Sequence, residues 1–214
     1  RVDYFIANSN YIAKRIEKYY RREAATIYPP VHINDYPVAE QADDYYLVVS
    51  RFVYYKRIDL AIGACNQLGK RLVIIGGGDE EKKLRAMAGP TIQFAGRVSD
   101  EEMMRYYVKA KAFLFPGEED FGITPVEAQS AGCPVIAYGR GGALETVLEG
   151  KTGLFFEAQT VDSLVCCIRD FERDGVEYTR KGIRNHSLKF DETRFKKEIE
   201  SECVKRMGKG SIGC

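Results

Sequence analysis

Residues 118–134, which read EEDFGITPVEAQSAGCP, decide the fold prediction. This stretch follows an apolar run at 112–115 and a Pro-Gly pair, and it leads into a helical pattern that Gly132 and Pro134 end. It therefore predicts a strand, a loop and the start of a helix. Open α/β sheets bind their ligands at such loops. We expect the chemistry of the chain to be concentrated here.

Two interpretations of Glu127 stay open at this point. Thr124 precedes Pro125, and proline is favoured at the first position of a helix, so Thr124 is the expected N-cap. Glu127 would then close a capping box on the Thr124 amide, which is the favoured interpretation of these residues alone. Alternatively, the free N–H groups of residues 122–126 hold an anion, while Glu119 and Glu127 accept hydrogen bonds from sugar or ribose hydroxyls.

Outward from this stretch, short apolar strands alternate with helices. The predicted strands span 45–49, 71–75, 91–95, 112–115, 134–137 and 154–156, and the predicted helices between them span 57–68, 80–88, 99–109, 125–131 and 143–149. Apolar strands separated by helices are typical of a parallel sheet covered on both faces. The fold class is therefore α/β, with a Rossmann-like parallel sheet.

The two ends of the chain differ from this pattern. A strand at 2–7, a helix to residue 20 and a strand at 24–28 precede a proline-rich linker, and helices at 162–171, 176–188 and 192–207 follow the sheet. We predict three parts: 1–36 as the end of a preceding domain and linker, 37–190 as the ligand-binding domain, and 191–214 as a C-terminal helix and tail. Because the chain opens inside a strand, we expect a piece of a longer polypeptide.

Composition narrows the function classes. The net charge of +1 argues against nucleic acid as a partner, and no apolar stretch approaches the roughly 20 residues that span a bilayer. Six cysteines without a C-x-x-C pair, and only two histidines, argue against a zinc site. We expect a cytoplasmic protein. The basic residues of the first helix predict a solvated face, with contact to an acidic membrane surface as the alternative: Lys14, Arg15, Lys18, Arg21 and Arg22.

Other loops at strand ends also suit an anionic ligand. Arg51 and Lys56 follow the strand at 45–49, and the pair suits a diphosphate because arginine offers a planar fork and lysine a compact charge. Gly76, Gly77 and Gly78 let the backbone approach a ligand, but the spacing is not the dinucleotide fingerprint, which disfavours a hydride-transfer enzyme. A further glycine-rich loop contains Gly139, Gly141 and Gly142.

Together these loops suit a sugar nucleotide, and at this point the chain resembles a known family. Segments 3–9, 27–31, 50–56, 76–79, 94–99 and above all the Glu-x7-Glu pattern from Glu119 to Glu127 resemble the donor-binding half of retaining glycosyltransferases of family 4, also called glycosyltransferase group 1. The resemblance implies one half of a GT-B fold and transfer of a hexose to a glycan or lipid-linked acceptor. Segments 28–31 and 50–51 look similar to mannosyltransferases of polysaccharide assembly, which favours GDP-mannose as donor.

The resemblance also implies roles for individual residues. Glu127 would hold the ribose hydroxyls and Glu119 would touch the transferred sugar, while Arg51 and Lys56 would bind the diphosphate. Backbone N–H groups of Gly122, Ile123 and Thr124 would join the diphosphate, and Gly78, Arg97 and Val98 would lie near the base. The resemblance also implies that no metal or other cofactor is needed, and two cations that offset the leaving-group charge are consistent with this.

Three other functions remain open beside the mannosyltransferase, and the resemblance also sets an expectation about transfer activity. A UDP-sugar glucosyl- or galactosyltransferase, a nucleotide-sugar epimerase and a non-catalytic nucleotide-sugar-binding module are the alternatives. The acceptor would need a preceding N-terminal Rossmann domain, of which only the last strand and helix are recognisable, so we expect donor binding with little transfer. In the family the last helix crosses back to that domain, a role that residues 190–207 could fill.

Overall fold

The computed structural model describes residues 2–33, 38–39, 41–173 and 178–209. The strands are β1 (Phe5–Ala7), β2 (Ala24–Thr26), β3 (Tyr46–Arg51), β4 (Leu72–Gly77), β5 (Ile92–Gly96), β6 (Ala112–Phe115), β7 (Val135–Tyr138) and β8 (Gly153–Phe156). The α-helices are α1 (Asn10–Tyr20), α2 (Ile58–Leu68), α3 (Glu81–Met87), α4 (Asp100–Lys109), α5 (Ile123–Ser130), α6 (Ala143–Thr146), α7 (Val161–Arg173), α8 (Arg180–Ser187) and α9 (Glu192–Lys209). Single turns of 3-10 helix lie at η1 (Tyr54–Lys56) and η2 (Leu188–Phe190).

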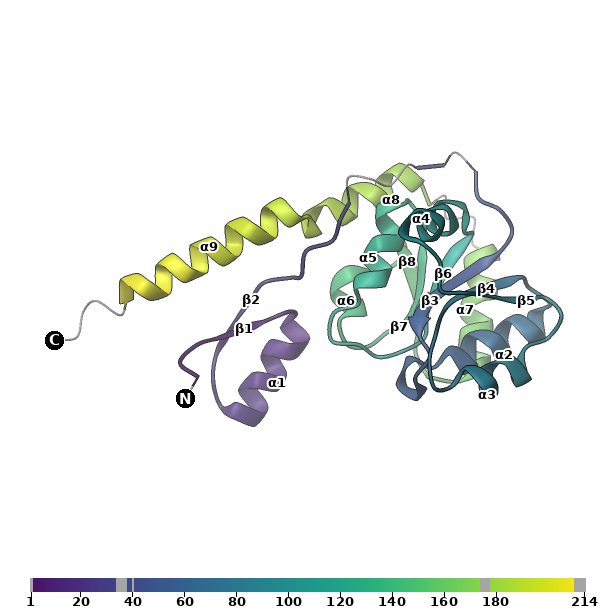
Figure 1. Ribbon diagram of the computed structural model, residues 1–214, viewed down its shortest axis with the longest axis horizontal. Coiled ribbons are helices and arrows are strands. Elements are labelled where there is room, and N and C mark those ends of the chain that lie inside the picture. The colour runs from purple at the N-terminus through teal and green to yellow at the C-terminus, as the bar shows by residue number, and fades with distance from the viewer. Residues whose placement is uncertain (1, 34–37, 40, 174–177, 210–214) are drawn as a thin grey trace.

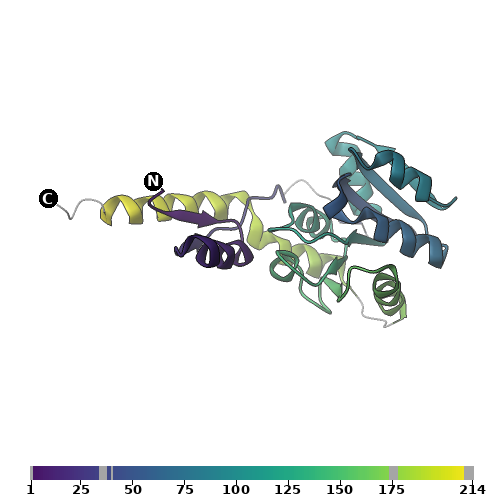
Figure 2. The same ribbon diagram turned by 90° about the horizontal axis from the view of Figure 1, so that it is seen from below.

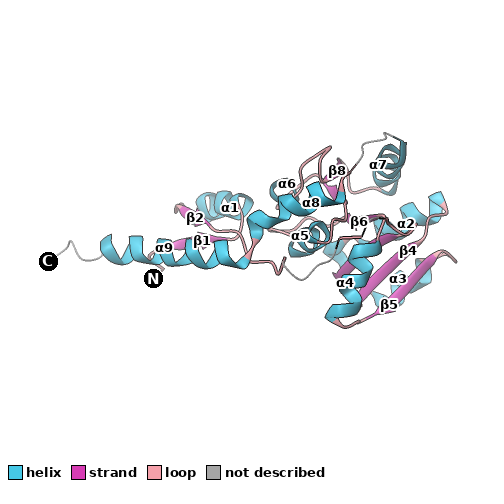
Figure 3. Ribbon diagram, turned by 90° about the horizontal axis from the view of Figure 1, so that it is seen from above, coloured by secondary structure: helices cyan, strands magenta, loops and turns pink. Residues whose placement is uncertain are grey.

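Six strands form one sheet in the order β5-β4-β3-β6-β7-β8, and every pairing is parallel. Alternate residues of each strand point to opposite faces, so Tyr46 and Val48 enter one apolar cluster while Leu47 enters the other. Helices α2, α3 and α7 cover the first face, and α4, α5 and α6 cover the second (Figures 1 and 3). The predicted Rossmann-like α/β fold is confirmed.

Most predicted elements are present, with boundaries shifted by a few residues. The capping box that opens α4 is confirmed, because Ser99 accepts from the Glu102 amide and Glu102 accepts from the Ser99 amide. The helix predicted over 143–149 ends at Thr146, three residues early. The start of the helix predicted from Val176 lies outside the described residues, and α8 begins at Arg180.

A small unit lies beside the main sheet. Strands β1 and β2 pair in parallel, α1 connects them, and α9 runs along them (Figures 1 and 2). Arg206 of α9 lies over the ring of Tyr4 at 4.5 Å. The last helix therefore does return to the N-terminal part of the chain, as the resemblance implied.

Two segments of chain connect the small unit to the sheet, and they touch where they cross. Val31 forms a parallel bridge with Asp191, and Arg194 donates hydrogen bonds to the carbonyls of Tyr28 and Pro29 at 2.9 and 3.3 Å. The predicted domain boundary between residues 36 and 37 lies outside the described residues, as does the tail at 210–214.

An aromatic cluster fills this crossing. Phe121 packs on Tyr28 and Phe190 with ring centroids 5.7 and 5.5 Å apart. Phe121 belongs to the loop after β6, so the crossing is packed directly against the stretch that decided the fold. Within the described residues, no helix combines the length and apolar character required to cross a bilayer.

Candidate functional site

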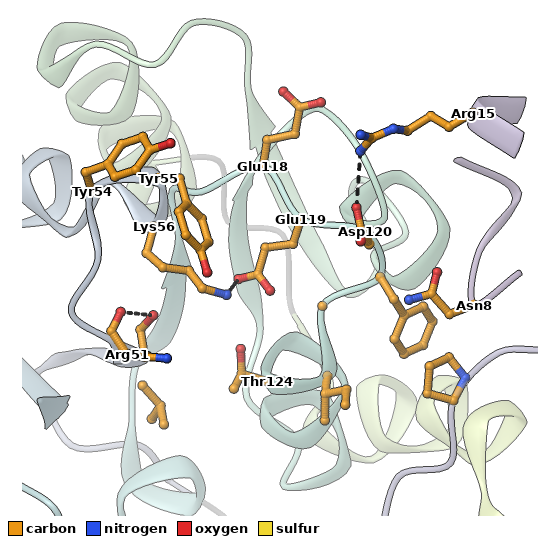
Figure 4. A pocket seen from close by; sticks show the side chains of 16 residues that line it. Asn8, Arg15, Arg51, Tyr54, Tyr55, Lys56, Glu118, Glu119, Asp120 and Thr124 are labelled. Carbon is orange, nitrogen blue, oxygen red and sulfur yellow. Dashed lines mark hydrogen bonds and ion pairs between the residues drawn. The ribbon is translucent and has the colours of Figure 1, made fainter. Parts of the chain in front are cut away.

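The sheet order creates a crevice between β3 and β6. The chain runs outward from β3 through β4 to β5 and then returns to place β6 on the other side of β3. The connections after β3 and β6 therefore lead to opposite faces of the sheet and leave a gap at the carboxyl ends, the usual ligand position in open α/β sheets. A cavity of about 830 Å³ opens here (Figure 4).

The cavity has one wall from each unit of the molecule. The lining residues come from the small unit and the segment after β2, from the end of β3 with η1, and from the loop after β6 with the start of α5: Asn8, Arg15, Pro29, Val49, Ser50, Arg51, Tyr54, Tyr55, Lys56, Glu118, Glu119, Asp120, Phe121, Gly122, Ile123 and Thr124. Six predicted site residues are among them, namely Arg51, Lys56, Glu119, Gly122, Ile123 and Thr124. The structure thus brings together the residues proposed for the diphosphate and the sugar.

Lys56 and Glu119 meet across the crevice. Lys56 Nζ lies 2.5 Å from Glu119 Oε1, and the side chains are only 19% and 22% exposed. Gly117 makes this approach possible, since a Cβ there would lie 3.1 Å from Lys56 Cα and from the Tyr55 carbonyl. The loop after β6 is therefore packed on η1, and the ion pair is held by backbone on both sides.

Arg51 is the cation without a partner in this cavity. It is the last residue of β3 and is exposed, and its guanidinium makes no hydrogen bond or ion pair with the residues that the structure describes. Its charge is thus available to an anionic ligand, whereas that of Lys56 is shared with Glu119.

The amino end of α5 points its first turn into the same cavity. Gly122 is the N-cap, with a φ of 86° that favours glycine, and no side chain among the described residues caps the helix. The prediction that Thr124 caps this helix is wrong: the helix begins at Ile123, and Pro125 is its third residue. Proline loses no hydrogen bond there, because the first four N–H groups of a helix have no intrahelical partner.

Glu127 makes a contact other than the capping box. Its carboxylate accepts a hydrogen bond from the hydroxyl of Tyr107 on α4, at 2.9 Å. Burial raises the pKa of Glu127, the Tyr107 hydrogen bond opposes that rise, and the charge of Asp100 adds to it. The capping-box interpretation is therefore wrong. Glu127 is half-buried beside α4 and does not line the cavity.

The residues predicted near the base also lie outside the cavity lining. Gly78 packs on the loop after β3, where a Cβ would come within 2.6 Å of the Phe52 carbonyl. Arg97 is exposed after β5, and Val98 packs against the apolar cluster of the second sheet face. Glu127, Gly78, Arg97 and Val98 are thus not brought into this cavity, and their roles stay predictions.

The small unit contributes residues that sequence reasoning missed. Arg15 of α1 pairs with Asp120 at 3.5 Å (Figure 4). Tyr11 of the same helix donates to Glu118 at 2.7 Å. The sequence predicts a solvated or membrane-facing surface for Arg15, whereas the structure places it in the cavity wall. The signal available in the sequence was the complementarity between a basic helix and the acidic triplet 118–120.

No group of three or more histidine, cysteine, aspartate or glutamate side chains arranged for a metal ion occurs within residues 2–33, 38–39, 41–173 and 178–209. The two histidines lie away from the cavity lining. His32 Nδ1 is 2.9 Å from Glu192 at the crossing, and His186 contacts the Thr146 carbonyl at 3.1 Å.

Comparison with known proteins agrees with this architecture. Residues 35–188 match the family described as "Glycosyl transferases group 1". A GDP-mannose-dependent alpha-(1-6)-phosphatidylinositol monomannoside mannosyltransferase of Mycolicibacterium smegmatis is 30% identical over 166 residues, which is 69% of this chain and 44% of that protein. A glycogen synthase of Xanthomonas axonopodis pv. citri is 33% identical over 60% of this chain and 29% of that protein. The chain thus aligns with less than half the length of these relatives.

Solved structures share the fold. Sucrose-phosphate synthase from Thermosynechococcus elongatus superposes with a TM-score of 0.85 at 23% identity, covering 99% of this chain and 60% of that one. Anabaena HepE in complex with UDP-glucose superposes with a TM-score of 0.83 at 21% identity, covering 95% and 64%. The sheet and its helices have the architecture of one half of a GT-B fold. The family match extends over all six strands of the sheet, and this chain belongs to the glycosyl transferases group 1 family.

Proposed function

We propose that this chain binds the nucleotide-sugar donor of a hexosyltransferase in the cavity between β3 and β6. The observation that carries the proposal is the arrangement of charges around that cavity. The free guanidinium of Arg51, the ammonium of Lys56 and the uncapped first turn of α5 all face one space. Two cations and a helix amino end together suit a diphosphate, which carries two or more negative charges.

The favoured donor is GDP-mannose. The support is the mannosyltransferase relative, whose name specifies GDP-mannose, at 30% identity. A glucosyl donor is the second candidate, because the glycogen synthase relative is 33% identical and one structural neighbour holds UDP-glucose. An epimerase is less well supported, because neither His32 nor His186 lines the cavity.

For the chemistry we propose transfer with retention, on one face of the sugar. The bond from the sugar C1 to the diphosphate breaks, the acceptor oxygen bonds C1 from the same side, and a departing diphosphate oxygen takes the acceptor proton. Arg51, Lys56 and the N–H groups of α5 offset the charge that develops on the diphosphate. A double displacement is less favoured, since Lys56 holds Glu119 and Glu127 lies outside the lining.

Glu127 would accept the ribose hydroxyls of the donor and Glu119 a hydroxyl of the sugar, with Gly78, Arg97 and Val98 nearest the base. No divalent metal is required by this scheme, so donor binding should persist in EDTA. The glycan or lipid-linked acceptor would be held by further protein beyond the donor cavity, and this chain by itself would transfer poorly. Turnover equal to that of a longer relative would contradict this last point.

The cytoplasm is the proposed site of action, with a peripheral membrane contact through α1. Lys14, Lys18 and Arg21 are exposed on that helix beside Tyr19 and Tyr20, which are 67% and 66% exposed. Basic and aromatic side chains together suit an anionic lipid surface. Co-sedimentation with anionic but not with neutral phospholipid vesicles is the expected result.

Calorimetric titration of the chain with GDP, UDP and ADP tests the donor site and its base preference together. Arg51→Ala should weaken the preferred nucleotide about tenfold or more. Arg71→Ala is the matched control, since Arg71 is an exposed arginine immediately before β4, at the opposite edge of the sheet. Equal effects of the two substitutions, or no binding by the unaltered chain, would refute the proposal.

A further inference from the structure

Helix α1 begins on a carboxylate that belongs to the other unit. The backbone N–H groups of Asn10 and Tyr11 donate to Glu145 at 2.8 and 2.9 Å. The side chain of the N-cap Ser9 accepts from the Ile12 amide, at 3.0 Å. Because the first N–H groups of a helix have no intrahelical partner, Glu145 completes a cap that the local sequence leaves unfinished.

Glu145 also holds the segment that leaves the small unit. The hydroxyl of Tyr28 donates to Glu145 Oε2 at 3.0 Å. Burial and this hydrogen bond both raise the pKa of Tyr28, so the phenol keeps its proton and remains a donor at neutral pH. One side chain therefore joins the start of α1 and the chain after β2 to helix α6.

Helix α6 is itself fixed to the floor of the cavity. The Gly142 amide, immediately before α6, donates to the Glu119 carbonyl at 2.8 Å. There is no room for a Cβ at Gly142, because the backbone of Phe121 occupies that space. The position of Glu145 is thus set by the same backbone that carries Glu119 into the cavity.

Side chains of α1 also contact the loop after β6. Tyr11 donates to Glu118, and one turn later Arg15 reaches Asp120. Arg15 is thus the cation that the small unit supplies to the cavity wall, opposite Arg51 and Lys56. Its side chain is 52% exposed and its ion pair is long, at 3.5 Å, so the helix position rather than this pair must keep it there.

We propose that Glu145 is a positioning residue that sets α1 against the loop after β6, so that Arg15 acts on the anionic ligand in the cavity. The inference rests on the proposed function, because it needs a ligand for Arg15 to act on. Glu145 itself does not line the cavity. Its effect on binding is exerted through Arg15.

A double-mutant cycle tests this coupling. Dissociation constants for the preferred nucleotide among GDP, UDP and ADP are measured by calorimetry on the unaltered chain, Arg15→Ala, Glu145→Ala and the double variant. We expect Arg15→Ala to weaken binding about fivefold in the unaltered chain and less than about twofold in the Glu145→Ala background. The same loss in both backgrounds, or no loss in either, would overturn the proposal.

Two further variants keep the test decisive. Glu145→Gln preserves the side-chain volume but places an amide NH2 against the α1 N–H groups, so it should reduce the Arg15 effect even if Glu145→Ala folds poorly. Glu149→Gln makes the same chemical change on an exposed residue shortly after α6. In this background Arg15→Ala should weaken nucleotide binding as much as it does in the unaltered chain. A Glu149→Gln result that matches Glu145→Gln would also count against the proposal.

Hydrogen exchange separates release of α1 from general unfolding. In the Glu145 variants the amides of residues 10–13 should exchange faster, while those of β4 keep their protection. If the unaltered chain binds nucleotide and Arg51→Ala weakens that binding as expected, the proposed function stands. An unchanged Arg15 effect in the Glu145 variants would then refute only the positioning role of Glu145. If the unaltered chain binds none of the three nucleotides, the proposed function fails and the positioning role fails with it.

Discussion

Lys56 Nζ and Glu119 Oε1 lie 2.5 Å apart and join the loop after β3 to the loop after β6. A diphosphate that uses Lys56 must therefore compete with Glu119. We predict that Glu119→Gln tightens the binding of a bare nucleoside diphosphate about fivefold, because Lys56 is released from a partly buried ion pair. The corresponding nucleotide sugar should gain less, since its contact with Glu119 is lost.

Calorimetry with GDP and GDP-mannose, or with UDP and UDP-glucose, measures both effects. Glu118→Gln is the matched control: it removes the same charge from the same cavity, but its partner is the hydroxyl of Tyr11 rather than a cation. Equal tightening by Glu118→Gln would show a general charge effect in place of competition for Lys56.

The contact between Tyr107 and Glu127 predicts a pH dependence of donor binding. Burial raises the pKa of Glu127, and the Tyr107 hydrogen bond favours its charged form. Tyr107→Phe should raise that pKa further, so the carboxylate takes up a proton at higher pH and accepts ribose hydroxyls less well. Affinity for the nucleoside diphosphate should then fall about threefold to fivefold more on acidification than in the unaltered chain.

A 2′-deoxyribose analogue serves as the internal control for that experiment. Because it lacks a hydroxyl for Glu127 to accept, its affinity should change less with pH in both proteins. An identical pH profile for the ribose and deoxyribose nucleotides would remove Glu127 from the ribose contact.

Two glycines, one immediately before α6 and one at the end of β4, predict a contrast between two small substitutions. Gly142 has a φ of −66°, which alanine tolerates, but the Phe121 backbone occupies the space of a Cβ. Gly142→Ala should therefore cost about 1–3 kcal/mol of unfolding free energy and weaken nucleotide binding, because the loop after β6 must move. At Gly77 the atoms of the described residues nearest to a Cβ would be Glu81 Oε2 at 3.6 Å and Arg97 Nε at 3.9 Å, both in ordinary contact.

Gly77→Ala should accordingly have little effect on either quantity. Urea unfolding and calorimetry on both variants provide the comparison. If Gly142→Ala and Gly77→Ala lower the unfolding free energy equally, close packing against the Phe121 backbone is not the reason for a glycine at position 142.

A charged network beneath the sheet predicts how stability depends on pH. Glu172 accepts from Lys111 at 2.7 Å, pairs with Lys70 at 2.7 Å and accepts from Tyr46 at 2.9 Å. Burial alone would raise its pKa, but the hydrogen bonds from Lys111, Lys70 and Tyr46 outweigh burial and lower the pKa from 4.5 to about 2. The free energy of unfolding that charged Glu172 contributes is therefore fully present above the pKa of its carboxyl in the unfolded chain. It is lost as the pH falls through the pKa of Glu172 in the folded chain.

Glu172→Gln should lose about 2–3 kcal/mol of unfolding free energy at neutral pH. The difference from the unaltered chain should shrink as the pH falls from 4.5 towards 2. Urea unfolding at a series of pH values measures it. A difference that stays constant across this range would mean that packing, rather than ionisation, explains the contribution of Glu172.

Local sequence patterns were sufficient for the sheet because each strand carries its own apolar signal. The runs around Leu72 and Phe113 are buried on both faces, and a strand buried in this way is apolar throughout. The same reasoning placed Arg51, Lys56 and Glu119 together, because parallel strands end at one edge. To place these three residues near one another, it was enough to know that the strands run in the same direction.

The failures occurred where a distant residue decided the outcome. The Thr-Pro-Val-Glu pattern suggested a capping box at Thr124, yet Glu127 bonds Tyr107, twenty residues away in sequence. Likewise α1 is capped in part by Glu145, 135 residues away from Asn10. No local pattern contains such a partner, and the contribution of Arg15 to the cavity wall was missed for the same reason.

The two crossing segments at the base of the cavity restrict how it can open. A body attached at two neighbouring points rotates about the line through them and translates little. A swing of the small unit about the line near Val31 and Asp191 would have to break the hydrogen bonds of Glu145 to α1 and to Tyr28. Phe121, packed against Tyr28 and Phe190 beside that line, would move least in such a swing. Because Phe121 immediately precedes Gly122, the first turn of α5 would keep its place in such a swing.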